Sequence, residues 1–253
     1  MADLSIIIPY YHEPFLDRTI DSIKENSILD TEILPMEGSL GMRDAVNEGL
    51  AKATGRFIMK CDAHCIFAPG FDKELVDSCQ DNWVMIPRRY SINTTDWTRS
   101  IEGYIFDYHY LAYPSLQIGN WPNRKSDLEI DFTMSYQGSC WFVNKDYFMK
   151  HIGYLDNRKE TYGSFVAEQL EVGLKYWLGG GEVKVNKKTW YAHLHKNHQS
   201  YKDGKFNRDY KQGSQWKKNW RWATDHWLND REPDMIHKLS WLVEKFAPVP
   251  TWE

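Results

Sequence analysis

Cysteine is scarce in this sequence, with four residues among 253 at irregular spacing. That is too few for the disulfide framework typical of small secreted proteins, so we expect reduced thiols. No run of 18 apolar residues occurs, and the first residues carry charge and proline around a very short apolar stretch. The sequence therefore predicts neither a transmembrane helix nor a signal peptide. These absences favour a cytoplasmic protein without stable membrane insertion.

The composition is that of a folded protein, because 42% of the residues are hydrophobic and 26% are charged. These values argue against disorder, and the length allows one large domain or one domain with an appendage. Repeats and low-complexity tracts are lacking. Twelve tryptophans and 15 tyrosines are unusually many, so we expect them to serve in packing, in stacking, or in both.

The net charge of −4 conceals a basic segment, residues 184–221. This segment holds eleven lysines and arginines against two aspartates, a local charge of +9, which leaves −13 for the rest of the chain. Such a segment could bind a polyanion such as DNA, or a diphosphate, and aromatic residues are interleaved with its charges. The alternative is a solvated surface whose long side chains point outward.

The first part of the chain alternates short apolar runs with helical periodicity. Apolar runs that end at proline, glycine or polar residues predict buried strands, and apolar residues at intervals of three and four predict helices. This order predicts a parallel sheet with right-handed crossovers. The expected elements are strands at 5–8, 31–36, 57–59 and 83–87, a helix at 14–27, and a helix through Met42, Val46 and Leu50.

The second part is less regular. Residues 91–135 are aromatic and rich in turn residues, so we expect irregular structure there. The remaining expected elements are strands at 136–143, 182–185 and 189–194, a helix starting near Lys145, a helix through Val166, Leu170, Leu174 and Trp177, and helical, tryptophan-rich structure beyond residue 205.

Asp62 and His64 follow the strand expected at 57–59. Ligands bind at the carboxyl ends of strands in open α/β sheets, and side chains two residues apart in an extended segment point the same way. A carboxylate beside an imidazole suits Mn²⁺ and similar divalent cations, which can bridge to phosphate oxygens. A surface turn or a core histidine is the alternative explanation of this short pattern.

Four stretches in a fixed order extend this pattern. They are Ser5-Ile-Ile-Ile-Pro-Tyr-Tyr-His-Glu13, Asn47-Glu-Gly-Leu-Ala-Lys-Ala-Thr-Gly55, Asp62-Ala-His-Cys65, and a run from Gly138 through Glu168-Gln-Leu-Glu171 to Ala192-His193. Together they resemble the GT-A nucleotide-sugar glycosyltransferases of family 2, and within that group the polypeptide N-acetylgalactosaminyltransferases. A bacteriophage or bacterial member is compatible with the small size of the chain.

The resemblance implies a fold and an activity. It implies an α/β GT-A (Rossmann-like) domain over residues 1–200 with a mostly parallel central sheet. Residues 201–253 would form a helical, basic, tryptophan-rich extension packed on that core. The implied activity is metal-dependent transfer of a hexose or N-acetylhexosamine from a nucleotide diphosphate, most plausibly UDP, to a hydroxyl acceptor.

The resemblance also implies a site. Asp62, His64 and His193 would ligate Mn²⁺ or Mg²⁺, and Asp62, His64 and Glu168 would be the catalytic residues. The candidate donor-binding residues are Pro9, Tyr10, Tyr11, Glu13, Glu37, Arg43, Asn47, Asp62, Ala63, Gly138, Glu168, Gln169 and Lys196. Two of them depart from the family pattern. The family usually carries an Asp-Asp pair after the second strand, where an acid contacts the base or ribose, and Glu37 could substitute for it. Arg43 has no clear counterpart in the family but could contact the diphosphate.

The acceptor is left open. A hydroxylated base in DNA, bound through residues 184–221, and a bacterial glycan are both compatible with the basic, aromatic segment. Two rival classes remain: a metal-dependent hydrolase using His193, His195 and His198, and a catalytically inactive GT-A domain that only binds. Tight zinc would favour the hydrolase, and weak, exchangeable Mn²⁺ the transferase.

Overall fold

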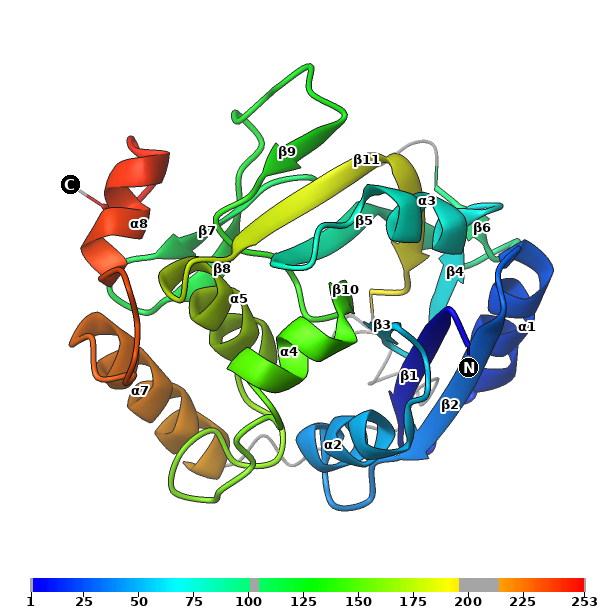
Figure 1. Ribbon diagram of the computed structural model, residues 1–253, viewed down its shortest axis with the longest axis horizontal. Helices are drawn as coiled ribbons and strands as arrows, with labels where there is room; N and C mark the ends of the chain where they lie inside the picture. The colour runs from blue at the N-terminus through cyan, green and yellow to red at the C-terminus, as the bar shows by residue number, and fades with distance from the viewer. Residues whose placement is uncertain (1, 101–104, 196–213, 253) are drawn as a thin grey trace.

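The computed structural model describes residues 2–100, 105–195 and 214–252. Within them, one sheet of nine strands has the order β2-β1-β3-β10-β5-β11-β4, with β6 paired to β5 and β9 paired to β11 (Figure 1). The strands along this order are β2 (Thr31–Glu37), β1 (Leu4–Tyr10), β3 (Phe57–Cys61), β10 (Cys140–Asn144), β5 (Trp83–Asn93), β11 (Glu182–His193) and β4 (Cys65–Phe67), and the side strands are β6 (Thr98–Arg99) and β9 (Ile130–Phe132).

Helices cover both faces of this sheet. In Figure 1, α2, α4 and α5 lie on one side of it and α1 and α3 on the other. Their bounds are α1 (Leu16–Asn26), α2 (Met42–Lys52), α3 (Phe71–Ser78), α4 (Lys145–His151) and α5 (Glu168–Leu178). The double cover explains why β1, β3 and β10 are mostly apolar and buried, since both of their faces are removed from water.

The β1-α1-β2-α2-β3 unit has the parallel arrangement that the sequence predicts, because β1 pairs in parallel with both β2 and β3. Gly49 allows α2 to lie directly on β1. A Cβ at this position would come within 2.5 Å of the side chain of Ile7. The glycine in the Asn47–Gly55 stretch therefore serves close packing of helix on strand.

The rest of the sheet is mixed, so the prediction of a mostly parallel sheet needs correction in its centre. Strand β10 lies antiparallel between β3 and β5, whereas β5 and β11 are parallel to each other. The two short strands expected at 182–185 and 189–194 form one strand, β11, whose pairing with β5 shifts register between Asn186 and Trp190. This irregularity interrupts the apolar pattern, which is why the sequence indicates two strands.

Part of the segment 91–135, for which irregular structure is expected, also forms strands. Strands β7 (His109–Ala112) and β8 (Gln117–Asn120) make an antiparallel pair, and β9 adds to the edge of β11. These strands are three or four residues long, too short to show periodicity in the sequence.

The C-terminal helices α7 (Ser214–Leu228) and α8 (Leu239–Phe246) use their tryptophans for packing. Trp227 is fully buried, and its indole N–H donates to the hydroxyl of Tyr162 over 2.7 Å. Trp220 donates its indole N–H to the carbonyl of Ser115. Packing thus accounts for these tryptophans better than an open stacking platform. A membrane-crossing helix, which must be both long and strongly apolar, is not found in the described part of the chain.

Candidate functional site

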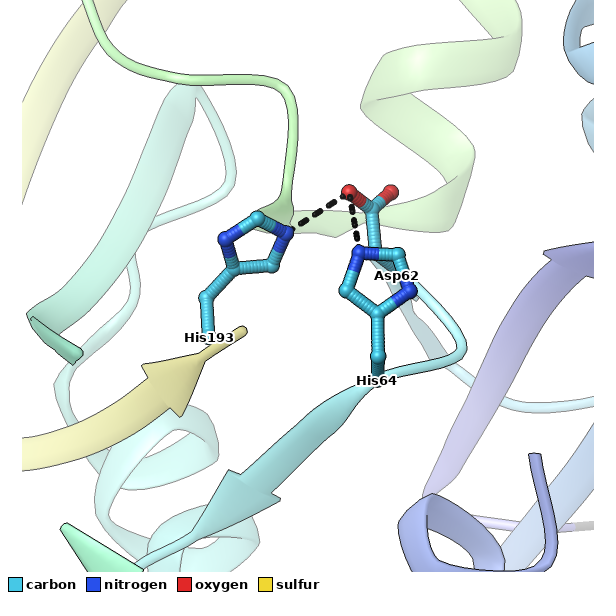
Figure 2. Close-up of side chains that lie close together, drawn as sticks. All are labelled: Asp62, His64 and His193. Atoms are coloured by element: carbon cyan, nitrogen blue, oxygen red, sulfur yellow. Dashed lines mark hydrogen bonds and ion pairs between the residues drawn. The ribbon is translucent and has the colours of Figure 1, made fainter. Parts of the chain in front are cut away.

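Three strands bring Asp62, His64 and His193 together. Asp62 follows the end of β3, His64 immediately precedes β4, and His193 is the last residue of β11. Because Cys65 of β4 pairs with His193 in the sheet, the two imidazoles are placed side by side, 4.8 Å apart between ring centres. Figure 2 shows both rings directed at the same carboxylate oxygen of Asp62.

The distances suit a divalent cation. Oδ2 of Asp62 lies 3.1 Å from Nε2 of His193 and 3.9 Å from Nε2 of His64. The three ligand atoms lie within 4.8 Å of one another, and the side chain of Asp62 is 30% exposed. One carboxylate with two imidazoles is a donor set that Mn²⁺ accepts. These residues therefore fit the cation that the sequence predicts.

Each imidazole has a second partner behind it. Nδ1 of His64 lies 3.1 Å from a carboxylate oxygen of Glu13, an arrangement that holds the ring and leaves Nε2 facing Asp62. Nδ1 of His193 lies 3.4 Å from the guanidinium of Arg89. Glu13, which the sequence suggests as a donor-binding residue, is thus seen here as the orienting partner of a histidine.

Burial controls the charge of the site. Burial lowers the pKa of His193 to about 3, despite the opposing effect of Asp62, so the ring is neutral and able to ligate a cation. For Asp62, burial alone would raise the pKa, but the charge of Lys60 and the hydrogen bond from His193 outweigh it and hold this pKa well below its usual range. The carboxylate is therefore ionised at neutral pH.

Lys60 is a site residue that the sequence interpretation missed. Its side chain is 2% exposed, and its ammonium lies 2.8 Å from Oδ1 of Asp62, 2.5 Å from the carbonyl of Gly138 and 3.4 Å from Oε2 of Glu168. Burial would lower the pKa of Lys60, but the charges of Asp62 and Glu168 more than compensate and raise it. The available signal was a lysine inside an otherwise apolar strand, two residues before Asp62.

Glu168 begins α5 and lies inside the protein, not on an exposed helix start. Its side chain is 3% exposed, and Oε1 accepts a hydrogen bond from the indole of Trp141 while Oε2 faces Lys60. A Cβ on Gly138 would lie 3.4 Å from Oε2 of Glu168 and 3.3 Å from the amide oxygen of Gln169. Lys60 therefore joins Glu168, Gly138 and Asp62, three of the predicted residues, in one cluster.

Arg89 is a second missed residue. It is 1% exposed and contacts both His193 and His195 through Nη2, and its guanidinium lies 4.5 Å from the ring centre of Phe106. Its Nε and Nη1 have no hydrogen-bond partner in the part of the chain that the structure describes. A buried cation without a carboxylate partner favours an anion nearby.

The sequence suggests Arg43 and Asn47 as donor-binding residues, but in this structure both make contacts that hold the fold together. Arg43 is fully buried, with its guanidinium bonded to Glu171 and to the carbonyl of Val166. The amide of Asn47 bonds in both directions with the backbone of Leu155. The side chain of Arg43 has no exposed surface, so it does not face solvent as a residue that meets the diphosphate would.

The other predicted donor-binding residues lie at the ends of β1, β2 and β3. Tyr10 of β1 pairs in register with Glu37 of β2, which is exposed, and Pro9 pairs with Met36. Ala63 is buried between the two ligands Asp62 and His64. Tyr11 follows β1 directly and is partly buried, and Lys196 lies outside the described residues.

The histidine cluster of the hydrolase alternative is not assembled among the described residues. His193 is grouped with Asp62 and His64, and His195, whose ring centre lies 5.5 Å from that of His193, contacts Arg89 and is not part of this group. His198, the third member, belongs to the undescribed stretch 196–213.

A cavity of about 320 Å³ is lined in part by Phe106, which contacts Arg89. Its other aromatic walls are Tyr108 and Trp121. Four basic residues against two acidic ones line it: Arg88, Arg124, Lys125, Lys187, Asp107 and Asp127. The cavity is therefore net positive as well as aromatic.

The basic segment 184–221 is only partly described. Lys184 and Lys188 form ion pairs with Glu182 and Glu74, which reduces their availability to a ligand. Lys187 lines the cavity, where its ammonium bonds to the carbonyl of Ser126 over 2.6 Å. On α7 the exposed basic residues are Lys217, Lys218 and Arg221.

Comparison with known proteins identifies sequences that are similar to this chain. Residues 34–153 match the model of glycosyl transferase family 2. The chain is 26% identical over 178 residues to a probable N-acetylgalactosaminyltransferase 7 of Caenorhabditis elegans, which covers 66% of this chain and 29% of the relative. It is 37% identical over 62 residues to human polypeptide N-acetylgalactosaminyltransferase 18, which covers 24% of this chain and 10% of the relative. The chain thus spans less than a third of the length of these relatives.

Solved structures agree on the fold. A crystal structure of GalNAc-T7 with UDP, GalNAc and Mn²⁺ matches with a TM-score of 0.68 at 16% identity, over 91% of this chain and 50% of that one. Staphylococcus aureus TarS matches with a TM-score of 0.50 at 14% identity, over 79% of this chain and 38% of that one. The fold is GT-A, and residues 34–153 match glycosyl transferase family 2, with sequence similarity to polypeptide N-acetylgalactosaminyltransferases.

Proposed function

We propose that this protein transfers a sugar from a UDP-sugar to a hydroxyl of an anionic acceptor, with Mn²⁺ or Mg²⁺ held by Asp62, His64 and His193. The observation that carries the proposal is the convergence of these three ligand atoms within 4.8 Å at the carboxyl end of β3, in a chain whose residues 34–153 match glycosyl transferase family 2. The related GalNAc-T7 structure contains UDP and Mn²⁺, which supports the choice of donor and cation.

The protein's own groups have separate roles in this proposal. The bound cation would neutralise the negative charge that develops on the departing diphosphate. Nε and Nη1 of Arg89 lack hydrogen-bond partners among the described residues, and its guanidinium adds positive charge beside His193. We therefore assign contact with the diphosphate, which the sequence suggests for Arg43, to Arg89. Oε2 of Glu168 lies 3.4 Å from the ammonium of Lys60 and can accept a further hydrogen bond, so we assign Glu168 to holding a sugar or acceptor hydroxyl through this oxygen.

The test of donor use is release of the nucleotide. UDP-glucose, UDP-galactose and their N-acetyl forms would be incubated with the protein and either Mn²⁺ or EDTA. We expect slow hydrolysis of one donor with Mn²⁺, and its loss with EDTA or with Asp62→Ala. Asp77→Ala is the control, since this exposed aspartate pairs only with Lys73 on α3. Hydrolysis that is indifferent to both EDTA and Asp62→Ala would refute the proposal.

For the acceptor we favour an anionic glycan. The cavity beside Phe106 offers aromatic faces for a sugar ring and a net positive lining for an acidic group. Arg124 is the best placed cation there, because its guanidinium lies 5.4 Å and 5.3 Å from the ring centres of Tyr108 and Trp121 and has no ion pair with a described residue. Transfer to phosphorylated or carboxylated glycans should exceed transfer to neutral ones and should fall with Arg124→Ala.

A hydroxylated base in DNA is the second candidate. The support is the basic segment 184–221, with Lys217, Lys218 and Arg221 exposed along α7. Binding to duplex DNA should then weaken steeply between about 50 and 200 mM salt. Transfer to hydroxymethylated duplex DNA, with no transfer to anionic glycans, would establish this candidate over the first.

A further inference from the structure

Lys60 occupies an unusual position for a lysine. Every residue of β3, from Phe57 to Cys61, is buried, and Lys60 is the only charged one. Its three N–H donors have three acceptors within reach: Oδ1 of Asp62, the carbonyl of Gly138 and Oε2 of Glu168. The ammonium is thus fully coordinated by the protein and cannot turn toward a ligand.

The two oxygens of each carboxylate have different partners. The ammonium of Lys60 donates a hydrogen bond to Oδ1 of Asp62, while Oδ2 faces Nε2 of both His64 and His193. The ammonium of Lys60 also lies 3.4 Å from Oε2 of Glu168, and Oε1 of Glu168 accepts a hydrogen bond from the indole N–H of Trp141. One oxygen of Asp62 is therefore directed at the imidazoles, and neither oxygen of Glu168 is.

We propose that Lys60 is a positioning residue that binds Asp62 and Glu168 into one charge-balanced unit and thereby sets the affinity and the ligand set of the cation site. It presents only Oδ2 of Asp62 to the cation and keeps Glu168 out of the ligand set. This inference rests on the cation site of the proposed function, and it adds what determines the strength of that site.

The physical consequence is a weaker cation site than the ligands alone would make. An ammonium in contact with the ligating carboxylate repels a divalent cation held on the other oxygen, and this repulsion is strong where water is excluded. Without Lys60, the carboxylates of Asp62 and Glu168 would lose the positive charge that they share, and a divalent cation is the group that would replace it. Removing Lys60 should therefore tighten cation binding while disturbing the placement of Glu168.

The opposite sign of these two effects separates a positioning role from a packing role. Loss of packing around Asp62 would weaken Mn²⁺ binding and turnover together. Loss of the Lys60 charge would strengthen Mn²⁺ binding and reduce turnover. Mn²⁺ affinity, measured without donor or acceptor, is thus the decisive quantity.

The experiment is Mn²⁺ titration of the full chain, followed by calorimetry or by the EPR signal of free Mn²⁺. The wild type is compared with Asp62→Ala, Lys60→Met and Lys175→Met. Lys175 is the matched control, since it is another lysine that bridges two acids, Glu171 and Glu232, with 15% of its side chain exposed. We expect Lys60→Met to bind Mn²⁺ at least about tenfold tighter, with donor hydrolysis at least about tenfold slower. Lys175→Met should bind as the wild type does.

The outcomes are distinct. No Asp62-dependent Mn²⁺ binding in the wild type would overturn the cation site, and the proposed function with it. Wild-type binding that is unchanged or weakened in Lys60→Met would overturn the role of Lys60 alone. If Lys60→Met does not fold, Glu168→Gln decides, because it keeps the shape and leaves the whole Lys60 charge on Asp62. Mn²⁺ affinity should then fall at least about threefold, and an unchanged affinity would refute the inference.

Discussion

Two clusters of buried charge lie along α5, and they differ in what they leave unsatisfied. At the start of the helix, Lys60 joins Asp62 and Glu168, and Asp62 keeps one oxygen facing two imidazoles with 30% of its side chain exposed. One turn later, Glu171 is enclosed by Arg43 and Lys175, and the Arg43–Glu171 pair has no exposed side-chain surface.

The difference separates a binding cluster from a structural one. In the second cluster both oxygens of Glu171 are used, by Arg43 on one side and by Lys175 and the backbone N–H of Asp156 on the other. Such a cluster holds α2 and α5 together but offers nothing to a ligand. Buried charge alone therefore does not mark a site, whereas a carboxylate oxygen that still faces two imidazoles does.

The largest effect should come from Asp62→Ala. The substitution removes the carboxylate on which both imidazoles converge, so Mn²⁺ binding should be lost and donor hydrolysis should fall by about 100-fold or more. The free energy of unfolding should change far less, because Asp62 is partly exposed. Titration and urea unfolding of the same variant measure both. Full Mn²⁺ affinity in this variant would place the cation elsewhere and break the comparison.

Glu171→Gln should show the reverse pattern. Removing this charge leaves Arg43 buried without its carboxylate, which should cost about 3–5 kcal/mol of unfolding free energy. Mn²⁺ affinity of the folded protein should stay as in the wild type, since the cation ligands are untouched. Urea unfolding together with Mn²⁺ titration measures the two quantities, and a loss of affinity at unchanged stability would assign Glu171 to the site.

Acid should weaken the fold on the side of Arg89. His109 is 3% exposed and its Nε2 has no hydrogen-bond partner among the described residues. Burial and the charge of Arg89 lower its pKa to about 3. The unfolded chain takes up this proton below about pH 6.5 and the native protein does not, so stability falls as the pH drops through that range. We expect a loss on the order of 1–2 kcal/mol between pH 7 and pH 5.

His109→Phe tests the source of this acid sensitivity. Unfolding free energies at pH 7 and pH 5 should differ less in this variant than in the wild type, because the titrating ring is gone. An equal loss in both proteins would assign the effect to other groups.

The smallest effect should come from Lys175→Met. Lys175 is the outer member of the second cluster, and Glu171 keeps its bond to Arg43 when the lysine is removed. The expected cost is about 1 kcal/mol in urea unfolding. A cost as large as that of Glu171→Gln would mean that Lys175, not Arg43, is the principal partner of Glu171.

Much of the sheet and the candidate cation ligands could be predicted from the sequence. The first three strands and the helices between them are local patterns of apolar residues, and Asp62 and His64 follow directly from the end of β3. His193 is 129 residues beyond His64, and it was identified only through its place in a motif of the family. The pairing of β4 with β11 supplies the physical reason for their proximity.

The roles of Arg43, Lys60 and Arg89 could not be read in this way. Arg43 lies in a segment of helical periodicity, and nothing near it in the sequence indicates its ion pair with Glu171, which is 128 residues later. Lys60 and Arg89 lie within strands, where the role of a charged side chain cannot be assigned until its partners are known. Their partners come from α5 and from β11, which are distant in sequence.

The sequence by itself determined the alternation of strands and helices, the family resemblance and two adjacent cation ligands, because each depends on residues close together in the chain. The tertiary structure decided the antiparallel insertion of β10, the convergence of His193 on Asp62, and which buried charges are satisfied. The reason is that a charge acts through its neighbours in space, and the sheet and α5 select those neighbours from more than a hundred residues away.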